Sequence, residues 1–217
     1  IRDGAIGRIV KVRLPDVHNK APNYYERGVG GRARPTQWRA SRKTAGGGAL
    51  IMNAIHQIDV LRFITGLEVE RVSAEWVNFT GRAEVEDMIN VVLRYDNGAI
   101  GTIDTANYAP GGGEAHVLRI YGTRGQLQLE RSGLKAYVDE PFADLTVGEW
   151  QDVPTERARD SRTLLLEDFV RSVATGAPPP VTARDGRAAL QTVLAAYEAA
   201  ERGRTVRLDE LASAVAV

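Results

Sequence analysis

The strongest pattern in the sequence is an apolar stripe at helical spacing between two glycine signals. Apolar residues recur every three or four positions at Leu50, Ala54, Ile58 and Leu61. This period predicts a helix with one buried face. Three glycines, residues 46–48, precede the stripe, and Gly66 closes it in the way that glycine commonly ends a helix. A glycine run at this place lets backbone or a ligand approach the helix N-terminus closely.

Alternating apolar and polar positions predict strands on both sides of this helix. The expected strands cover residues 5–14, 69–79, 88–95, 99–108, 116–121, 126–129 and 134–138. Asp96-Asn97-Gly98 is typical of a tight hairpin turn, and residues 122–125 form a second short connection. Strands that follow one another through short turns favour an antiparallel sheet over a parallel, wound one.

The strand at 88–95 carries apolar side chains on both of its faces. One face holds Ile89, Val91, Leu93 and Tyr95, and the other holds Met88 and Val92. If helices cover one face of the sheet, the second face keeps exposed apolar side chains. We interpret that second face as a candidate subunit interface.

Helical spacing returns in the last third of the chain. Residues 161–175 are expected to form a helix that stops before Gly176, and residues 185–202 a second one that ends at Gly203. Three prolines at 178–180 separate the two helices. Residues 205–208 look extended. The pattern therefore predicts an α+β fold.

Residues 16–45 read as a long polar loop that leads directly into the glycine run. It contains Trp38, Arg39, Lys43 and further arginines and tyrosines. This content suits oxygen-rich or anionic small ligands. The alternative interpretation is a solvated, partly disordered loop.

Composition narrows the class of protein. The chain has 217 residues, 43% hydrophobic and 26% charged, with a formal net charge of zero, which argues against a broad nucleic-acid surface. It has no cysteine, which excludes disulfides and a thiol nucleophile and fits the cytoplasm. No apolar run has the length of a membrane span. Since the first residue is Ile1, we expect the chain to be part of a longer protein.

The predicted helix at 50–65 contains one histidine, His56. Asn53 lies one turn before it and Asp59 one turn after it, so the three side chains can share a face. His56 is either a structural residue paired with Asp59 or a general acid/base at the mouth of a pocket, and spacing leaves both open. We interpret His18 and His116 as surface or strand residues.

Four segments give the chain a resemblance to the C-terminal domain of the Gfo/Idh/MocA oxidoreductases. They are Gly4-Ala5-Ile6-Gly7-Arg8-Ile9, the stretch from Trp38-Arg39 through the glycine run to Ile55-His56-Gln57-Ile58-Asp59, Tyr121-Gly122-Thr123-Arg124-Gly125, and the end from Asp185 to Val206. The resemblance keeps the order of the segments and spans essentially the whole chain.

The resemblance implies a two-domain enzyme of which this chain is one half. Residues 1–217 would be the substrate-binding and oligomerisation domain, an open, largely antiparallel sheet with helices packed on one face. The family's N-terminal Rossmann domain, which binds NAD or NADP, has no counterpart in this sequence, and neither has its Glu-Lys-Pro segment with the catalytic lysine. The chain alone is therefore expected to be inactive, and a homo-oligomer is expected to form through the open sheet face.

The resemblance also assigns residues. His56 matches the family's histidine beside the substrate, so it would be the catalytic residue. Arg39, Lys43 and Asn53 become candidate substrate contacts, and Trp38 a candidate pocket wall. Met52 stands where many members have an aspartate, and it can neither accept nor orient a proton.

Three functions stay open from the sequence. The first is an NAD(P)-dependent oxidoreductase acting on a sugar, a polyol or a related hydroxy compound. The second is a ligand-binding or oligomerisation module without catalysis, which Met52 would favour. The third is a lyase or glycoside hydrolase that uses transient oxidation by the same cofactor.

Overall fold

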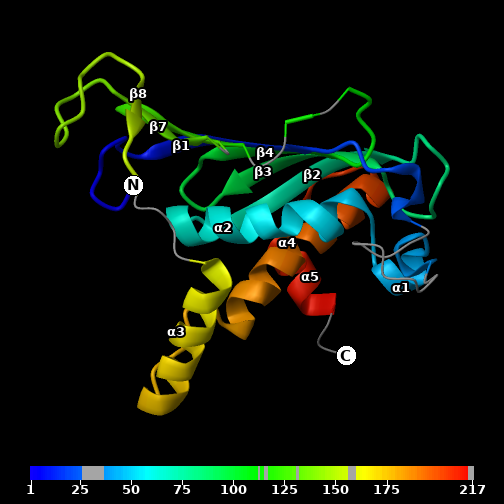
Figure 1. Ribbon diagram of the computed structural model, residues 1–217. Coiled ribbons are helices and arrows are strands. Elements are labelled where there is room, and N and C mark those ends of the chain that lie inside the picture. Colours follow the sequence, from blue (N-terminus) through cyan, green and yellow to red (C-terminus); the bar gives the residue numbers. More distant parts are fainter. Residues whose placement is uncertain (26–36, 112, 115–116, 131, 156–159, 215–217) are drawn as a thin grey trace.

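The computed structural model describes residues 1–25, 37–111, 113–114, 117–130, 132–155 and 160–214. These residues form one open nine-stranded sheet with the helices on one side (Figure 1). The order across the sheet is β8-β7-β6-β5-β1-β4-β3-β2-β9. The strands are β1 (Ile9–Val17), β2 (Val69–Val77), β3 (Met88–Tyr95), β4 (Ile100–Ala106), β5 (Leu118–Gly122), β6 (Gly125–Glu130), β7 (Gly133–Val138), β8 (Gln151–Val153) and β9 (Val206–Arg207). The predicted fold class is confirmed.

One neighbouring pair of strands in the described sheet is parallel. β1 runs parallel to β4, with Arg13 opposite Thr102 and Val17 opposite Ala106. The other neighbours pair antiparallel. Because β1 and β4 run in the same direction, their carboxyl ends meet at one edge of the sheet. That edge places the polar residues that follow each strand next to one another.

The predicted apolar stripe forms the core beneath the sheet. Leu50 and Ala54 lie in a π-helical turn, η3 (Leu50–Ala54), which continues into α2 (Ile55–Thr65). Together with Ile58 and Leu61 they are buried against the inner face of the sheet. The helix ends at Gly66, which has a left-handed φ of 70° as predicted.

Two long helices complete the chain. α3 (Ser161–Thr175) has the predicted bounds, and α4 (Ala183–Arg202) begins slightly earlier than predicted. α4 packs beside α2 and under β2. The Thr182 and Asp185 side chains cap its first turn reciprocally, which explains its sharp start. A short helix, α5 (Leu208–Ala214), follows β9 and was not predicted. None of the described helices is long and apolar enough to cross a bilayer.

The segment predicted as a structureless loop contains structure of its own. β1 extends to Val17, so its strand lies later than the predicted range 5–14. Two short 3-10 turns follow, η1 (Pro22–Tyr24) and η2 (Gln37–Arg39), and then α1 (Arg42–Ala45). The interpretation of 16–45 as one unstructured loop is therefore wrong for its described parts. Residues 26–36 lie outside the described residues.

The two faces of β3 differ as its sequence predicts. Ile89, Val91, Leu93 and Tyr95 are buried under the helices. Val92 faces the open side with 53% of its surface exposed, and Ile100 of the neighbouring strand is also exposed. In Figure 1 the helices lie on the other side of the sheet. The use of this face as a subunit interface stays a prediction.

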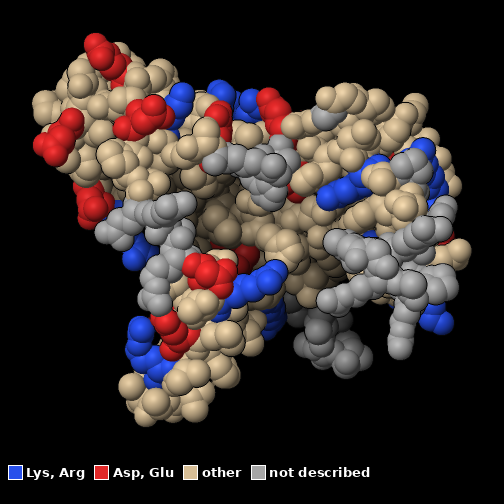
Figure 2. Space-filling model, viewed as in Figure 1, with Lys and Arg blue, Asp and Glu red and all other residues tan. Residues whose placement is uncertain are grey.

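α3 projects from the body of the molecule and carries an uncovered apolar face. Its exposed apolar side chains are Leu165, Leu166, Phe169, Val170 and Val173. Near its start the underside of the sheet and the end of α2 form a groove of about 510 Å³, lined among others by Phe63, Ile120 and Leu134. Figure 2 shows a hollow with uncharged atoms in its depth above α3. Apolar surfaces of this kind mark sites of contact with other protein.

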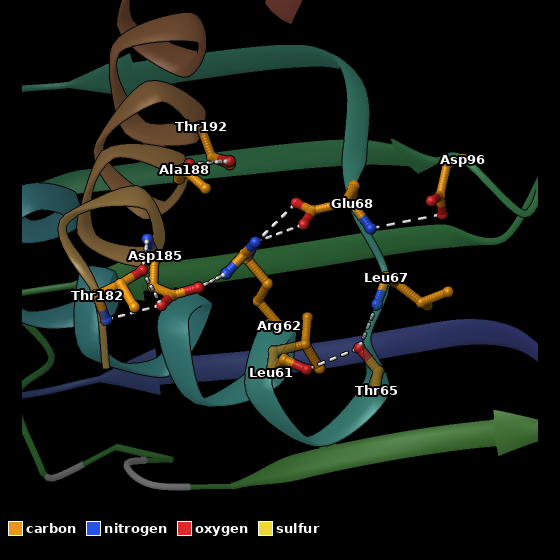
Figure 3. A network of polar contacts seen from close by, with 10 residues as sticks. All are labelled: Leu61, Arg62, Thr65, Leu67, Glu68, Asp96, Thr182, Asp185, Ala188 and Thr192. Atoms are coloured by element: carbon orange, nitrogen blue, oxygen red, sulfur yellow. Dashed lines mark hydrogen bonds and ion pairs between the residues drawn. The ribbon is translucent and has the colours of Figure 1, made fainter. Parts of the chain in front are cut away.

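Arg62 ties α2 to α4 and to the segment before β2 (Figure 3). Its guanidinium donates to Asp185 and, through Nε at 2.8 Å, to Glu68. Asp185 also accepts from the hydroxyl and the amide of Thr182, at 2.6 and 2.8 Å. Hydrogen bonds hold the pKa of the Asp185 carboxyl well below its ordinary value. The bonds from Thr182 have the larger effect, and the bond from Arg62 adds to it.

Because the lowered pKa of Asp185 belongs to the folded state, Asp185 stabilises the fold fully above the ordinary carboxyl pKa of 3.8 and progressively less below it. We expect Asp185→Asn to lower the free energy of unfolding at neutral pH and the difference from wild type to shrink as the pH falls below about 4. Urea unfolding at several pH values measures this. Asp152→Asn, on the exposed part of β8, is the control. A difference that does not vary with pH would contradict the role of the charge.

Candidate active site

Other residues of the chain occupy the space beside the glycine run that precedes η3. Glu86, in the loop before β3, is buried, and its carboxylate accepts hydrogen bonds from the amides of Gly48 at 2.6 Å and Leu50 at 3.0 Å. A Cβ at Gly48 would collide with the Glu86 carbonyl oxygen. Of the two partners expected for this helix N-terminus, backbone or ligand, the structure shows the backbone and side chain of residue 86.

A chain of amide and hydroxyl groups starts at Asn53, inside the π-helical turn. Asn53 Nδ2 donates to Asn107 Oδ1 at 2.9 Å, and Asn107 Nδ2 donates to the hydroxyl of Tyr25 at 3.3 Å. Asn107 follows β4 directly, and both it and Tyr25 are buried. Burial raises the pKa of Tyr25, while its bond with Asn107 acts in the opposite direction. This chain fixes the amide of Asn53 at the edge where β1 and β4 end.

Aromatic rings and cations extend the cluster on the side of η1 and η2. The rings of Tyr24 and Tyr25 meet edge to face at 5.2 Å. The Arg39 guanidinium lies over both Tyr24, at 5.3 Å, and Trp38, at 4.4 Å. Such stacked guanidinium groups keep their charge and their donors, which suits contacts with hydroxyl or carboxylate groups. Arg39, the candidate substrate contact, and Trp38, the candidate pocket wall, therefore lie together.

Met52 joins that wall to the helix. The Tyr24 hydroxyl lies 3.8 Å from its sulfur, within reach of a weak hydrogen bond. Lys20 places its ammonium 5.4 Å from the centre of the Tyr24 ring. Partial burial lowers the pKa of Lys20, the nearby Arg39 adds to this, and Asp16 opposes it. The edge of the sheet thus carries two cations beside an apolar and aromatic surface.

His18 also lies at this edge, directly after β1, and its side chain contacts a buried carboxylate. Its Nε2 is 3.1 Å from Oδ1 of Asp16, which is buried at the end of β1. The interpretation of His18 as a plain surface or strand residue is therefore incomplete. His116 lies outside the described residues.

His56 is exposed, in the first turn of α2. Within the part of the chain that the structure describes, neither Asp59 nor Asn53 forms a hydrogen bond with its ring. Lys43 is exposed on α1, and no described residue bonds to its side chain, so its assignment stays a prediction.

The fold and this cluster can be compared with known proteins. Residues 1–208 match the family model of the Gfo/Idh/MocA proteins that is described as "Oxidoreductase family, C-terminal alpha/beta domain". The chain belongs to this oxidoreductase family. The resemblance found in the sequence is thereby confirmed over nearly its whole length.

Members of the Gfo/Idh/MocA family with known activities lie among the relatives. The myo-inositol 2-dehydrogenase of Thermotoga maritima is 31% identical over 169 residues, which cover 76% of this chain and 50% of the relative. The crystal structure of the aldose-aldose oxidoreductase from Caulobacter crescentus, complexed with glycerol, has a TM-score of 0.76 and 26% identity over 95% of this chain and 57% of that one.

A third member was solved with a nicotinamide cofactor. GenD2 from gentamicin A biosynthesis, in complex with NAD, has a TM-score of 0.68 and 27% identity, and covers 94% of this chain and 56% of that one. This chain spans about half the length of the curated relatives it matches. The family is one of oxidoreductases, its members among the relatives include sugar and polyol dehydrogenases, and this chain corresponds to the C-terminal alpha/beta domain.

The sequence pointed to only part of this cluster. Asn53, Arg39 and Trp38 were singled out because they lie on or just before one glycine-flanked helix, whereas no described contact joins His56 to the cluster. Tyr25, Asn107 and Lys20 were missed, because they come together only through the parallel pairing of β1 with β4. The predicted strand at 99–108 included Asn107, whereas β4 ends at Ala106, so no sequence signal indicated that Asn107 stands at the end of a strand.

Proposed function

We propose that this chain is the substrate-binding half of an NAD(P)-dependent oxidoreductase acting on a sugar, a polyol or a related hydroxy compound. The observation that carries the proposal is the exposed His56 on the same short helix as Asn53, whose amide is fixed by Asn107, in a chain that matches this oxidoreductase family over residues 1–208. Amides, a guanidinium and an aromatic wall are the groups that recognise a hydroxylated ring.

In the proposed reaction the substrate hydroxyl becomes a carbonyl. The nicotinamide, when bound, supplies the hydride acceptor for the hydrogen on carbon. His56 accepts the proton of the hydroxyl, because a neutral imidazole is a base suited to this step near neutral pH. Asn53 and Arg39 donate hydrogen bonds to neighbouring oxygens and orient the ring. Met52 offers no carboxylate to His56, so the imidazole acts here without one.

The cofactor itself is proposed to be held mainly outside this chain. The glycine run at 46–48 cannot cradle a pyrophosphate, because Glu86 already occupies the amides behind it. The match to a C-terminal domain supports a separate N-terminal Rossmann domain as the place of NAD or NADP. We also propose that the active protein is a homo-oligomer joined through the open sheet face, and that it works in the cytoplasm.

The test is turnover by the full-length protein, with the native upstream sequence, on a panel of sugars and polyols with NAD⁺ and NADP⁺. We expect reduced nicotinamide to appear with at least one panel member and one cofactor. The 217-residue chain alone is the matched control, and it should bind neither NADH nor NADPH in calorimetry.

Three other outcomes would contradict the proposal. Binding of a panel compound without any cofactor reduction would favour the ligand-binding module. Bond cleavage with no net change in the cofactor would favour the lyase or glycosidase chemistry. Binding of a dinucleotide by the short chain would contradict the division between the two domains.

A further inference from the structure

The first amides of the helix that carries Asn53 and His56 are all held by two residues from elsewhere in the chain. These amides belong to Gly48, Ala49, Leu50 and Ile51. The Glu86 carboxylate accepts from the first and third, and its backbone carbonyl accepts from the second at 3.2 Å. The hydroxyl of Tyr197, on α4, accepts from the fourth at 3.3 Å. A helix normally leaves its first four amides without intrahelical partners, so this start is fully capped.

Glu86 and Tyr197 also bond to each other. The Tyr197 hydroxyl donates to Oε1 of Glu86 at 2.9 Å. Glu86 is buried, and burial raises its pKa, while the bonds from Leu50, Tyr197 and Gly48 act in the opposite direction. Its carboxylate thus has a partner at each oxygen. We call this arrangement of Glu86, Tyr197 and the four amides the helix clasp.

At Gly47 and Gly48 the clasp leaves no room for side chains. A Cβ at Gly47 would collide with the Tyr197 hydroxyl, and one at Gly48 would collide with the Glu86 carbonyl oxygen. The run at 46–48, which the sequence singled out as an approach to the helix N-terminus, therefore serves a contact between this helix, the loop before β3 and α4.

The turn that leaves the clasp is π-helical. The Ile55 amide donates to the carbonyl of Leu50, five residues back, where an α-helix would bond four residues back. The extra residue in this turn changes the direction in which the following side chains project. Asn53 lies within the turn and reaches Asn107, and His56 is the second residue after the turn. The position at which the first turn is anchored therefore determines the direction in which the Asn53 and His56 side chains project.

We propose that Glu86 and Tyr197 are positioning residues, which through the helix clasp fix the π-helical turn and so orient Asn53 and His56 toward the substrate. The orientation toward substrate rests on the proposed function. The effect of the clasp on the orientation of Asn53 and His56 does not depend on the proposed function, so it can be measured without turnover.

Glu86→Gln and Tyr197→Phe in the full-length protein test this. Glutamine keeps the volume but has one acceptor oxygen, so it cannot hold both the Gly48 and the Leu50 amides. We expect kcat of the folded Glu86→Gln protein to fall about tenfold or more, since small displacements of reacting groups cost this much. Tyr197→Phe removes one bond and should give a smaller loss. Glu84→Gln, an exposed carboxylate in the same loop, is the control and should keep kcat.

A second measurement separates the inference from the proposed function. The NMR signals of the Asn53 side-chain amide and the His56 ring, assigned with Asn53→Ala and His56→Ala, are compared without substrate. We expect both to shift in Glu86→Gln and neither to shift in Glu84→Gln. If the signals shift in a protein that turns over no substrate, the proposed function fails and the positioning role stands. If a folded Glu86→Gln or Tyr197→Phe protein keeps both signals and kcat, the inference is overturned. If only the melting temperature of such a variant falls, the clasp is a purely structural cap and the inference is likewise overturned.

Discussion

Replacing His56 with alanine is expected to lower kcat of the full-length protein by about 10²- to 10⁴-fold, the usual contribution of a positioned acid or base. His56 is exposed at the start of α2, and Asn53 on the preceding turn is fixed by Asn107 at 2.9 Å. Alanine removes the proton acceptor without leaving a cavity, because the ring is not part of the core. The fold and substrate binding should therefore persist while turnover is lost.

The measurement is steady-state kinetics on a substrate from the panel, with substrate affinity determined by calorimetry. Asp59→Asn is the matched control, since Asp59 lies one turn later on the same helix and no described contact joins it to His56. It should keep most of the turnover. Unchanged turnover in His56→Ala would exclude the acid/base role, and a joint loss of affinity and turnover would indicate that His56 binds rather than reacts.

The second large effect is expected at Gly48. Gly48→Ala should destabilise the fold by about 3 kcal/mol or more, at or beyond the upper end of the usual cost of overpacking a core position. The added Cβ would collide with the backbone carbonyl oxygen of Glu86, and backbone cannot turn aside as a flexible side chain can. Moving residue 86 would also stretch the bonds that its carboxylate accepts from Gly48 and Leu50.

Gly186→Ala is the matched control, and its change in the free energy of unfolding should have the opposite sign. Gly186 lies in the first turns of α4, and a Cβ there meets no atom within 4 Å. Alanine is favoured over glycine inside a helix by about 0.5–1 kcal/mol, so this variant should be slightly more stable than wild type. Urea unfolding of the three proteins decides the point. A Gly48→Ala protein with wild-type stability would show that the loop before β3 can withdraw freely.

Much of the architecture could be predicted because its signals are local. The stripe at Leu50, Ala54, Ile58 and Leu61 is buried as its period predicts. Asp96-Asn97-Gly98 connects β3 to β4, with Gly98 at a φ of 84°. α3 has the predicted bounds, because Gly176 and the prolines beyond it end the helix within a few residues. In each case the residues that decide the structure are neighbours in the sequence.

The features that escaped prediction depend on residues far apart in the chain. The parallel pairing of β1 with β4 follows from the order of strands in the sheet, which no short pattern encodes. The π-helical turn at Leu50–Ala54 depends on the Glu86 carboxylate, which comes from a different loop. The contact between Asn53 and Asn107 requires both features. Only part of the candidate site could therefore be predicted, since Asn107, Tyr25 and Lys20 join it through the pairing of distant strands.

The position of β1 has a consequence for the order in which the sheet can assemble. β1 lies at the middle of the sheet and is the first of its strands to be made, yet Lys11 pairs with Ile100 and Val12 with Ile120. The hairpins β2–β3–β4 and β5–β6–β7 can each form from neighbouring segments, whereas β1 has to wait until both exist. During synthesis the first strand is an open edge on both sides, and a chain that lost it would hold two separate small sheets with nothing between them.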